Sequence, residues 1–239
     1  MTTMILDRMA DSWRLLWLSA KTVGGRRFYL WPPLPLLWPA WQWFRSFMGW
    51  REEGPFQPPD AQVGLIAFPL VVLAIMLGVR VIAGEIDRRT LEIAYTVPGG
   101  THRIWLYKLA AGLGILLTAE ALLAGAAFAI TDYPPMALYG ALQAALFYMV
   151  LSAALAAAFK SEAAGALVTI VILVINFPMQ ESALRISPFW NPEALPGSTD
   201  PRDLLAWTTQ NRIGFALAIA AIAALAFGRA ESREKLLGG

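Results

Sequence analysis

A charged segment, residues 84–105, lies between two long apolar stretches and holds the groups that could do chemistry. Its carboxylates, guanidinium groups and apolar side chains recur at spacings that a helix accepts, and they could form ion pairs and apolar contacts with another protein. The residues concerned are Glu85, Arg88, Arg89, Thr90, Leu91, Glu92, Arg103 and Lys108. Pro98 and two glycines break the pattern, and Thr101 can cap a second helix. The pattern predicts a short amphipathic helix that docks in a groove of a soluble partner. The alternative is a solvated loop that binds no partner.

A second set of polar residues lies inside the apolar stretches, at Glu120, Gln143 and Asn176. A carboxylate within a membrane is costly and usually functional, so Glu120 could line a substrate path or carry a proton. It could equally be a neutral or paired group that fixes helix packing. Interhelical hydrogen bonding is the simpler interpretation of the two amides. These three residues are the candidates for a translocation path.

Other chemistry is limited by what the sequence lacks. His102 is the one histidine and there is no cysteine, so a metal site or a Ser-His pair has little support. The phosphate-binding pattern Gly-x-x-x-x-Gly-Lys-Ser/Thr does not occur. We therefore expect no catalytic residue, no cofactor and no metal in this chain.

The composition indicates a membrane protein. Of the 239 residues, 57% are hydrophobic and 15% are charged, whereas soluble domains have about 25% charged residues. The net charge of +2 is too small to suggest nucleic acid as a partner. No polar stretch is long enough for a separate soluble domain, so residues 1–239 are predicted to form a single transmembrane domain.

The elements that position these groups are predicted to be helices, in an all-α polytopic membrane protein. A spanning helix needs about 20 mostly apolar residues, and six stretches are predicted to cross. They cover approximately 28–44, 61–83, 106–130, 136–159, 163–180 and 212–228. The first contains several prolines, which kink helices. Residues 1–27 predict an amphipathic helix suited to the membrane interface, the alternative being a helix packed on the protein's own inner face.

The distribution of basic residues predicts the orientation. With six crossings and both termini in the cytoplasm, most lysines and arginines face inward, as the positive-inside rule requires. The basic residues in the predicted outer loops are limited to Arg45, Arg51, Arg185, Arg202 and Arg212. This orientation places the segment 84–105 in the cytoplasm and the long loop 181–211 outside. The predicted location is the plasma membrane.

The charged segment resembles that of the membrane permeases of type-2 ABC exporters. Those proteins have a Glu, then Gly-or-Arg-Thr-Leu-Glu, a Pro, a few polar residues and a Lys at the foot of the third span. The matching residues here are Glu85, Arg89, Thr90, Leu91, Glu92, Pro98, Arg103 and Lys108. The six-span plan, the amphipathic N-terminal helix and the long outer loop also agree. One departure is Arg89, at a position where glycine is common in the family.

The resemblance implies a transport role. It implies that 88–98 is a coupling helix seated in a cleft of an ABC ATPase subunit, which would bind ATP and Mg²⁺. It also implies a second permease copy or homologous permease, and export of a substrate by alternating access. Membrane lipids and an outer-side accessory protein are further candidate partners. The sequence leaves open the substrate and the choice between homodimer and heterodimer.

Two other classes of function stay open. One is an intramembrane enzyme that uses Glu120, although no second carboxylate or nucleophile motif accompanies it. The other is a non-catalytic membrane scaffold, whose charged segment recruits some other partner.

Overall fold

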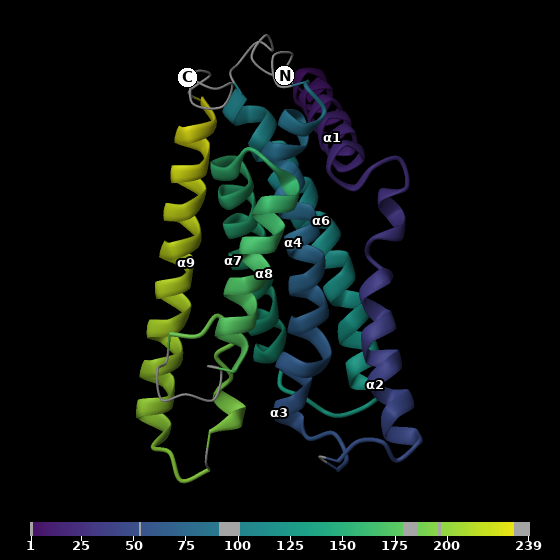
Figure 1. Cartoon of the computed structure of the whole chain (residues 1–239), viewed down its shortest axis with the longest axis vertical. Coiled ribbons are helices and arrows are strands. Elements are labelled where there is room, and N and C mark those ends of the chain that lie inside the picture. Colours follow the sequence, from purple (N-terminus) through teal and green to yellow (C-terminus); the bar gives the residue numbers. More distant parts are fainter. Residues whose placement is uncertain (1, 53, 91–100, 179–185, 196, 232–239) are drawn as a thin grey trace.

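The computed structural model describes residues 2–52, 54–90, 101–178, 186–195 and 197–231 (Figure 1). These residues form helices and no strands, as the all-α prediction requires. The α-helices are α1 (Thr2–Gly24), α2 (Leu37–Phe47), α3 (Pro58–Asp60), α4 (Phe68–Asp87), α6 (Thr101–Phe128), α7 (Met136–Phe159), α8 (Glu162–Asn176) and α9 (Pro201–Glu231). The shorter elements are η1 (Phe28–Leu30), η2 (Leu34–Leu36), the π-helix η3 (Ala61–Ala67) and η5 (Pro192–Ala194).

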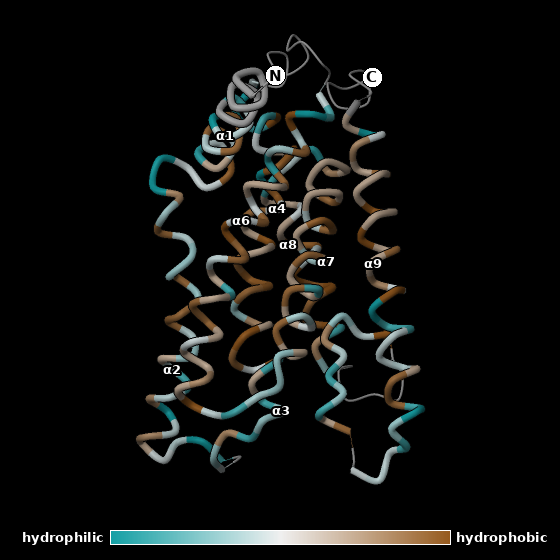
Figure 2. Tube along the Cα trace, turned by 180° about the vertical axis from the view of Figure 1, so that it is seen from behind, coloured by the Kyte–Doolittle hydropathy of each residue, from teal (hydrophilic) through white to brown (hydrophobic). Residues whose placement is uncertain are grey.

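The long helices form an elongated bundle in which α7 is central. It packs most extensively on α4 and also contacts α8 and α9, while α6 lies against α4 and α1 (Figure 1). Hydrophobic residues fill the middle of the bundle and hydrophilic residues gather at its two ends (Figure 2). This banding is expected of helices whose central turns lie in hydrocarbon.

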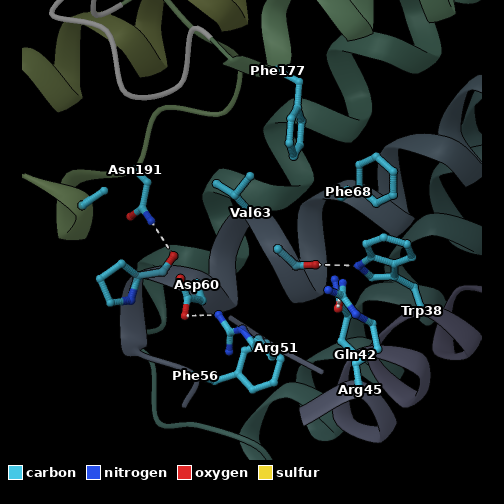
Figure 3. Close-up of a pocket in the computed structure, with 13 residues that line it drawn as sticks. Trp38, Gln42, Arg45, Arg51, Phe56, Asp60, Val63, Phe68, Phe177 and Asn191 are labelled. Carbon is cyan, nitrogen blue, oxygen red and sulfur yellow. Dashed lines mark hydrogen bonds and ion pairs between the residues drawn. The ribbon is translucent and has the colours of Figure 1, made fainter. Parts of the chain in front are cut away.

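A π-helix interrupts the long helical run that contains α4, and its cause is in the sequence. Pro69 has no N–H, so the carbonyl of Gly64, five residues earlier, cannot receive a π-type backbone bond. The Trp38 indole instead donates to that carbonyl at 2.7 Å, a bond drawn as a dashed line in Figure 3. The proline therefore both distorts the helix and provides a contact between it and α2.

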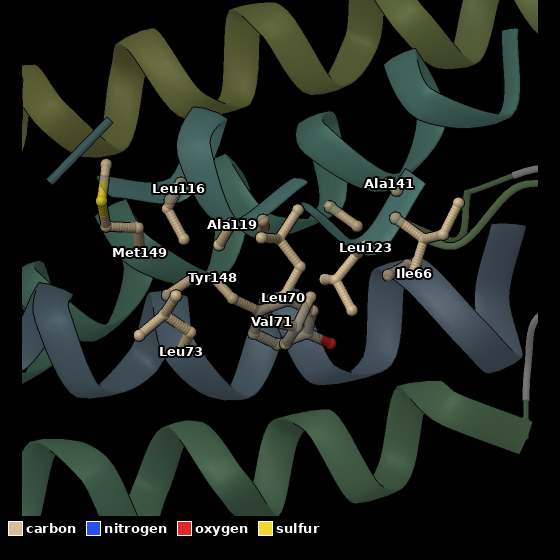
Figure 4. Packing of buried hydrophobic residues seen from close by; sticks show 14 of the residues in the cluster. Ile66, Leu70, Val71, Leu73, Leu116, Ala119, Leu123, Ala141, Tyr148 and Met149 are labelled. Atoms are coloured by element: carbon tan, nitrogen blue, oxygen red, sulfur yellow. The ribbon is translucent and has the colours of Figure 1, made fainter. Parts of the chain in front are cut away.

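The core is a layer of aliphatic and aromatic side chains from α4, α6 and α7. Leu70 and Leu73 of α4 meet Leu116 and Leu123 of α6, with Tyr148 of α7 between them (Figure 4). All five are at most 1% exposed. Contacts of this kind, rather than the hydrophobic effect, hold helices together within a membrane.

Small residues bring the helix backbones into close approach. A Cβ placed on Gly165 of α8 would lie 2.4 Å from the Ala156 Cα atom of α7. A Cβ on Gly78 of α4 would lie 2.2 Å from the Met149 carbonyl oxygen of α7. Both positions therefore require glycine for the observed helix spacing.

Four helical runs among the described residues are long and apolar enough to cross a membrane. They are Pro58–Asp87, Thr101–Phe128, Met136–Phe159 and Pro201–Ala230. The other two predicted spans differ. The predicted span 28–44 forms two 3₁₀ turns and the 11-residue α2, because its prolines prevent a regular helix. The predicted span 163–180 forms the 15-residue α8, which ends at Asn176.

The helix that contains the last predicted span, 212–228, begins before the span itself. Helix α9 begins at Pro201, so the second part of the predicted outer loop is helical and continues into the last apolar stretch. Proline is well suited to the first turn of a helix, where its missing N–H costs no bond. The described part of the loop is therefore limited to 186–195 and 197–200.

Helix α1 lies against α6, with one face on the bundle and another exposed (Figure 1). Val23 is fully buried, whereas Trp13 and Leu18 are 67% and 56% exposed beside the exposed Arg14 and Lys21. Exposed tryptophan next to basic side chains is typical of a helix in the membrane interface. The structure thus gives α1 a surface for each of the two interpretations drawn from the sequence.

Candidate functional site

The end of α4 carries a buried ion pair to α6. Lys108 Nζ lies 2.5 Å from Glu85 Oε1 and donates a second hydrogen bond to the Val81 carbonyl at 3.2 Å. The two side chains are only 3% and 15% exposed. The Thr90 hydroxyl donates to the other Glu85 oxygen. Each charge is thus balanced inside the protein, and the two helices are linked at this point.

The chain leaves α4 through a tight turn at Arg89. Its φ is +57°, in the left-handed region. The N–H of Arg89 donates to the Ile86 carbonyl, and the N–H of Thr90 donates to the Glu85 carbonyl at 2.9 Å. These two bonds define a Schellman motif, which usually places glycine at the left-handed position. The sequence departure at Arg89 is therefore a departure in residue type and not in backbone geometry.

Two further contacts connect the end of α4 to α1. Arg88 Nη1 donates to the Thr22 carbonyl at 3.2 Å, and Arg80 Nη1 donates to the Val23 carbonyl at 3.3 Å. The Arg80 guanidinium also lies over the Trp31 ring, 5.1 Å from its centroid. Arg80 thus binds to α1 and to the Trp31 ring through these two contacts.

The same end of α4 also contacts the start of α8. Asp87 Oδ2 accepts a hydrogen bond of 3.0 Å from the Glu162 backbone N–H, and Glu162 Oε2 lies 3.7 Å from Arg80 Nε. A carboxylate at a helix N-terminus satisfies a free N–H and interacts favourably with the helix dipole. The last turns of α4 are therefore bonded to α1, α6 and α8 together.

Of the charged segment 84–105, the structure describes residues 84–90 and 101–105, so the predicted coupling helix at 88–98 stays a prediction. Residues 84–87 belong to α4, and the turn at Arg89 ends that helix before the rest of the charged segment. Leu91, Glu92 and Pro98 lie outside the described residues. Thr101 is the first described residue of α6, and it is buried.

A groove of about 310 Å³ lies beside the ion pair, between α1, α4 and α6. Its polar rim includes Glu85, Lys108 and Arg103, and its apolar wall includes Leu15 and Leu18. Both leucines are exposed, at 37% and 56%. The described residues of the predicted coupling site, among them Glu85, Arg103 and Lys108, thus lie on or next to one surface. An amphipathic segment of a partner could bind there.

The three candidate path residues lie apart, since no described contact joins them. Glu120 is buried on α6, and its Oε1 has no hydrogen-bond partner within the described part of the chain. Gln143 of α7 exchanges hydrogen bonds with Arg212 of α9. Asn176 is the last residue of α8, beside the Tyr148 hydroxyl. The translocation path therefore stays a prediction.

A polar network at the opposite end of the bundle was not predicted from the sequence. The Arg212 guanidinium donates to Gln143 Oε1 at 2.9 Å and to the Trp190 carbonyl at 3.4 Å. Gln62 donates to the same carbonyl at 2.7 Å. A Cβ on Gly140 would lie 2.6 Å from Gln62 Nε2, so glycine leaves room for these side chains. The network connects α7, α9 and η3 to the loop before η5.

Arg212 is 8% exposed, although the sequence suggested an outer-loop arginine. The useful signal was the isolation of Gln62, Gln143 and Arg212 within or beside apolar stretches. Such residues commonly pair with one another in a membrane. Spacing along the chain could not show which of them would meet.

The long apolar helices and buried polar contacts define a polytopic membrane protein. The family model for ABC-2 family transporter proteins matches residues 1–225, and the chain belongs to this family. It is therefore a membrane permease component of an ABC transporter, as the resemblance of the charged segment implied. No curated protein and no solved structure matches the chain.

Proposed function

We propose that this chain is the permease subunit of an ATP-driven exporter whose ATP is bound and hydrolysed by a separate ABC ATPase subunit. The observation that carries the proposal is the set of contacts around the last turns of α4, with the Glu85–Lys108 pair at its centre. A force applied to the segment that follows Thr90 would reach α1, α6 and α8 through these contacts. Two permeases and two ATPase subunits would form the working unit.

In the proposed topology the chain crosses the plasma membrane six times and has both termini in the cytoplasm. The start of α1 and the finish of α9 lie at the same end of the bundle (Figure 1). The chain between α1 and the end of α2 runs from that end to the opposite one (Figure 1). An irregular segment can cross a membrane if its backbone groups that lack helical hydrogen bonds are bonded to other parts of the protein. The bond from the Trp31 indole to the Gly24 carbonyl, at the end of α1, is of this kind.

Transport would follow from rigid-body movement of linked helices. ATP binding would close the ATPase pair and move the segment 88–98 and the groove lined by Leu15 and Leu18. Because α4 and α6 are joined by a buried ion pair, they would move together. The path between two permeases would then open to the outer side, which is alternating access between two conformations of differing affinity for ATP.

Topology can be tested with single cysteines, because the native sequence contains none. We expect a cysteine at Gly49, which follows α2, to react with a membrane-impermeant maleimide on intact cells. A cysteine at Lys160, in the turn between α7 and α8, should react only after the membrane is opened. Equal labelling of both sites from outside would contradict the proposed crossing of 28–47.

Coupling can be tested in a complex of this chain purified with its ABC ATPase partner. We expect Leu91→Asp or Glu92→Ala to lower the ATPase activity that the permease stimulates. Arg229→Ala, at an exposed site near the end of α9, is the matched control and should have no effect. If no ATPase copurifies with the native chain, the exporter proposal fails.

Glu120 supports a second candidate function, because its buried carboxylate has an unbonded oxygen within the described part of the chain. In an intramembrane enzyme Glu120→Gln should abolish activity, even without an ATPase subunit. In the exporter the same variant should alter transport while ATP hydrolysis by the complex continues. Measurement of both activities in one preparation separates the two functions.

A further inference from the structure

A cavity of about 460 Å³ lies at the end of the bundle away from the α4–α6 ion pair (Figure 3). It is formed by α2, the π-helix, the end of α8 and the loop around η5. Its apolar wall includes Trp38, Val63, Phe68 and Phe177. The ring centroids of Trp38 and Phe68 are 4.7 Å apart, and those of Phe68 and Phe177 are 5.6 Å apart. This wall presents a continuous apolar surface on one side of the cavity.

The other side of the cavity is lined by two arginines, Arg45 and Arg51, and by the carboxylate of Asp60. Arg51 is paired with Asp60 at 2.9 Å, and the backbone N–H of Gln57 also donates to that carboxylate. Arg45 also lines the cavity, and its contact is a 3.4 Å hydrogen bond to Gln42 Oε1. No carboxylate within the described residues pairs with Arg45. Arg45 is therefore a cavity-lining arginine for which the described residues supply an amide oxygen as partner and no carboxylate.

Four aromatic side chains on α2 or just after it are exposed on the surface of the protein. Trp41, Trp43, Phe47 and Trp50 are 47%, 55%, 72% and 58% exposed. Tryptophan gathers where hydrocarbon meets the polar headgroups of a bilayer. Arg45 lies on the same short helix, so a bilayer interface at these tryptophans would bring a lipid phosphate to the cavity.

We propose that this cavity binds an anionic phospholipid of the membrane. The phosphate would accept hydrogen bonds from the Arg45 guanidinium, whose planar donors match phosphate oxygens. The first part of an acyl chain would lie along Trp38, Phe68 and Phe177. A zwitterionic lipid would place its own cation near Arg45 and Arg51, so a lipid with a net negative headgroup is preferred. This site is independent of the proposed ATPase partner.

The test is lipid retention by the purified chain, measured by native mass spectrometry. The probes are phosphatidylglycerol, phosphatidylcholine with the same acyl chains, and inorganic phosphate. We expect preferential binding of phosphatidylglycerol, and about tenfold weaker binding in Arg45→Gln, because one charge-assisted contact is lost. Arg202→Gln removes an exposed arginine at the start of α9, outside the cavity, and should bind normally.

A second variant separates the cavity from the charge. Ala194 is exposed at the cavity edge, so Ala194→Trp should obstruct the cavity without disturbing the core. It should lose phosphatidylglycerol binding although Arg45 is intact. The proposal is overturned if both variants bind the lipid as well as the native chain. It is also overturned if phosphatidylcholine binds equally, or if inorganic phosphate competes at the same concentration as the lipid.

Discussion

Replacement of Lys108 by methionine should destabilise the permease, because it leaves the Glu85 carboxylate in a mostly buried site with only Thr90 as a partner. Removal of one member of a buried ion pair costs about 3–5 kcal/mol. The remaining hydrogen bond from Thr90 places the expected loss near the lower value. For a protein of this size, about 3 kcal/mol corresponds to a fall of roughly 6–12 °C in Tm.

The double variant Glu85→Gln/Lys108→Met gives the sharper result. It removes both charges together, so no unpaired charge remains, and replacement of a whole buried pair is often nearly neutral. We therefore expect the double variant to be more stable than Lys108→Met by about 2 kcal/mol. Arg88→Gln removes an exposed hydrogen bond to the Thr22 carbonyl and a charge outside the buried pair, and it should lose less than about 1 kcal/mol.

The assay is thermal unfolding of the purified chain in one detergent, followed by circular dichroism. The native chain, Glu85→Gln, Lys108→Met and the double variant form a double-mutant cycle. Arg88→Gln is a separate control. If the losses of Glu85→Gln and Lys108→Met simply add in the double variant, to within about 0.5 kcal/mol, the pair does not couple α4 to α6. The route proposed for force from the ATPase subunit would then be refuted.

Three further predictions use the same unfolding measurement. Gly165→Ala should cost about 1–3 kcal/mol by forcing α8 away from α7, whereas Gly114→Ala, in open space on α6, should stabilise by about 0.5–1 kcal/mol; equal effects would argue against the close approach. Arg89→Gly should be more stable than Arg89→Ala by about 0.5–1 kcal/mol, because only glycine adopts the left-handed turn freely, and the reverse order would contradict that geometry. Arg212→Met should cost about 1–3 kcal/mol, since Gln143 loses its donor, and should increase proteolysis of the outer loop; unchanged proteolysis would show that the network does not hold the loop.

The membrane class and the position of the charged segment could be predicted from the sequence. Runs of apolar residues that are long enough for the bilayer have few alternatives to helix, since unpaired backbone groups cannot remain in hydrocarbon. The resemblance carried by Glu85, Thr90 and Lys108 is local in sequence, and the family match supports it. The helix ends at Asp87 and Pro201 came from the structure, because apolar patterning does not respond to a left-handed turn or to a polar first turn of a helix.

The sequence by itself therefore determined an all-helical membrane permease with a charged segment between its second and third apolar stretches. Only the tertiary structure decided that Glu85 meets Lys108, that Asp87 bonds the start of α8, and that Arg212 is buried against Gln143. The physical reason is that these partners are 23 to 75 residues apart along the chain. Their meeting depends on how closely the helices approach, and contacts such as that between Gly165 and Ala156 set this distance.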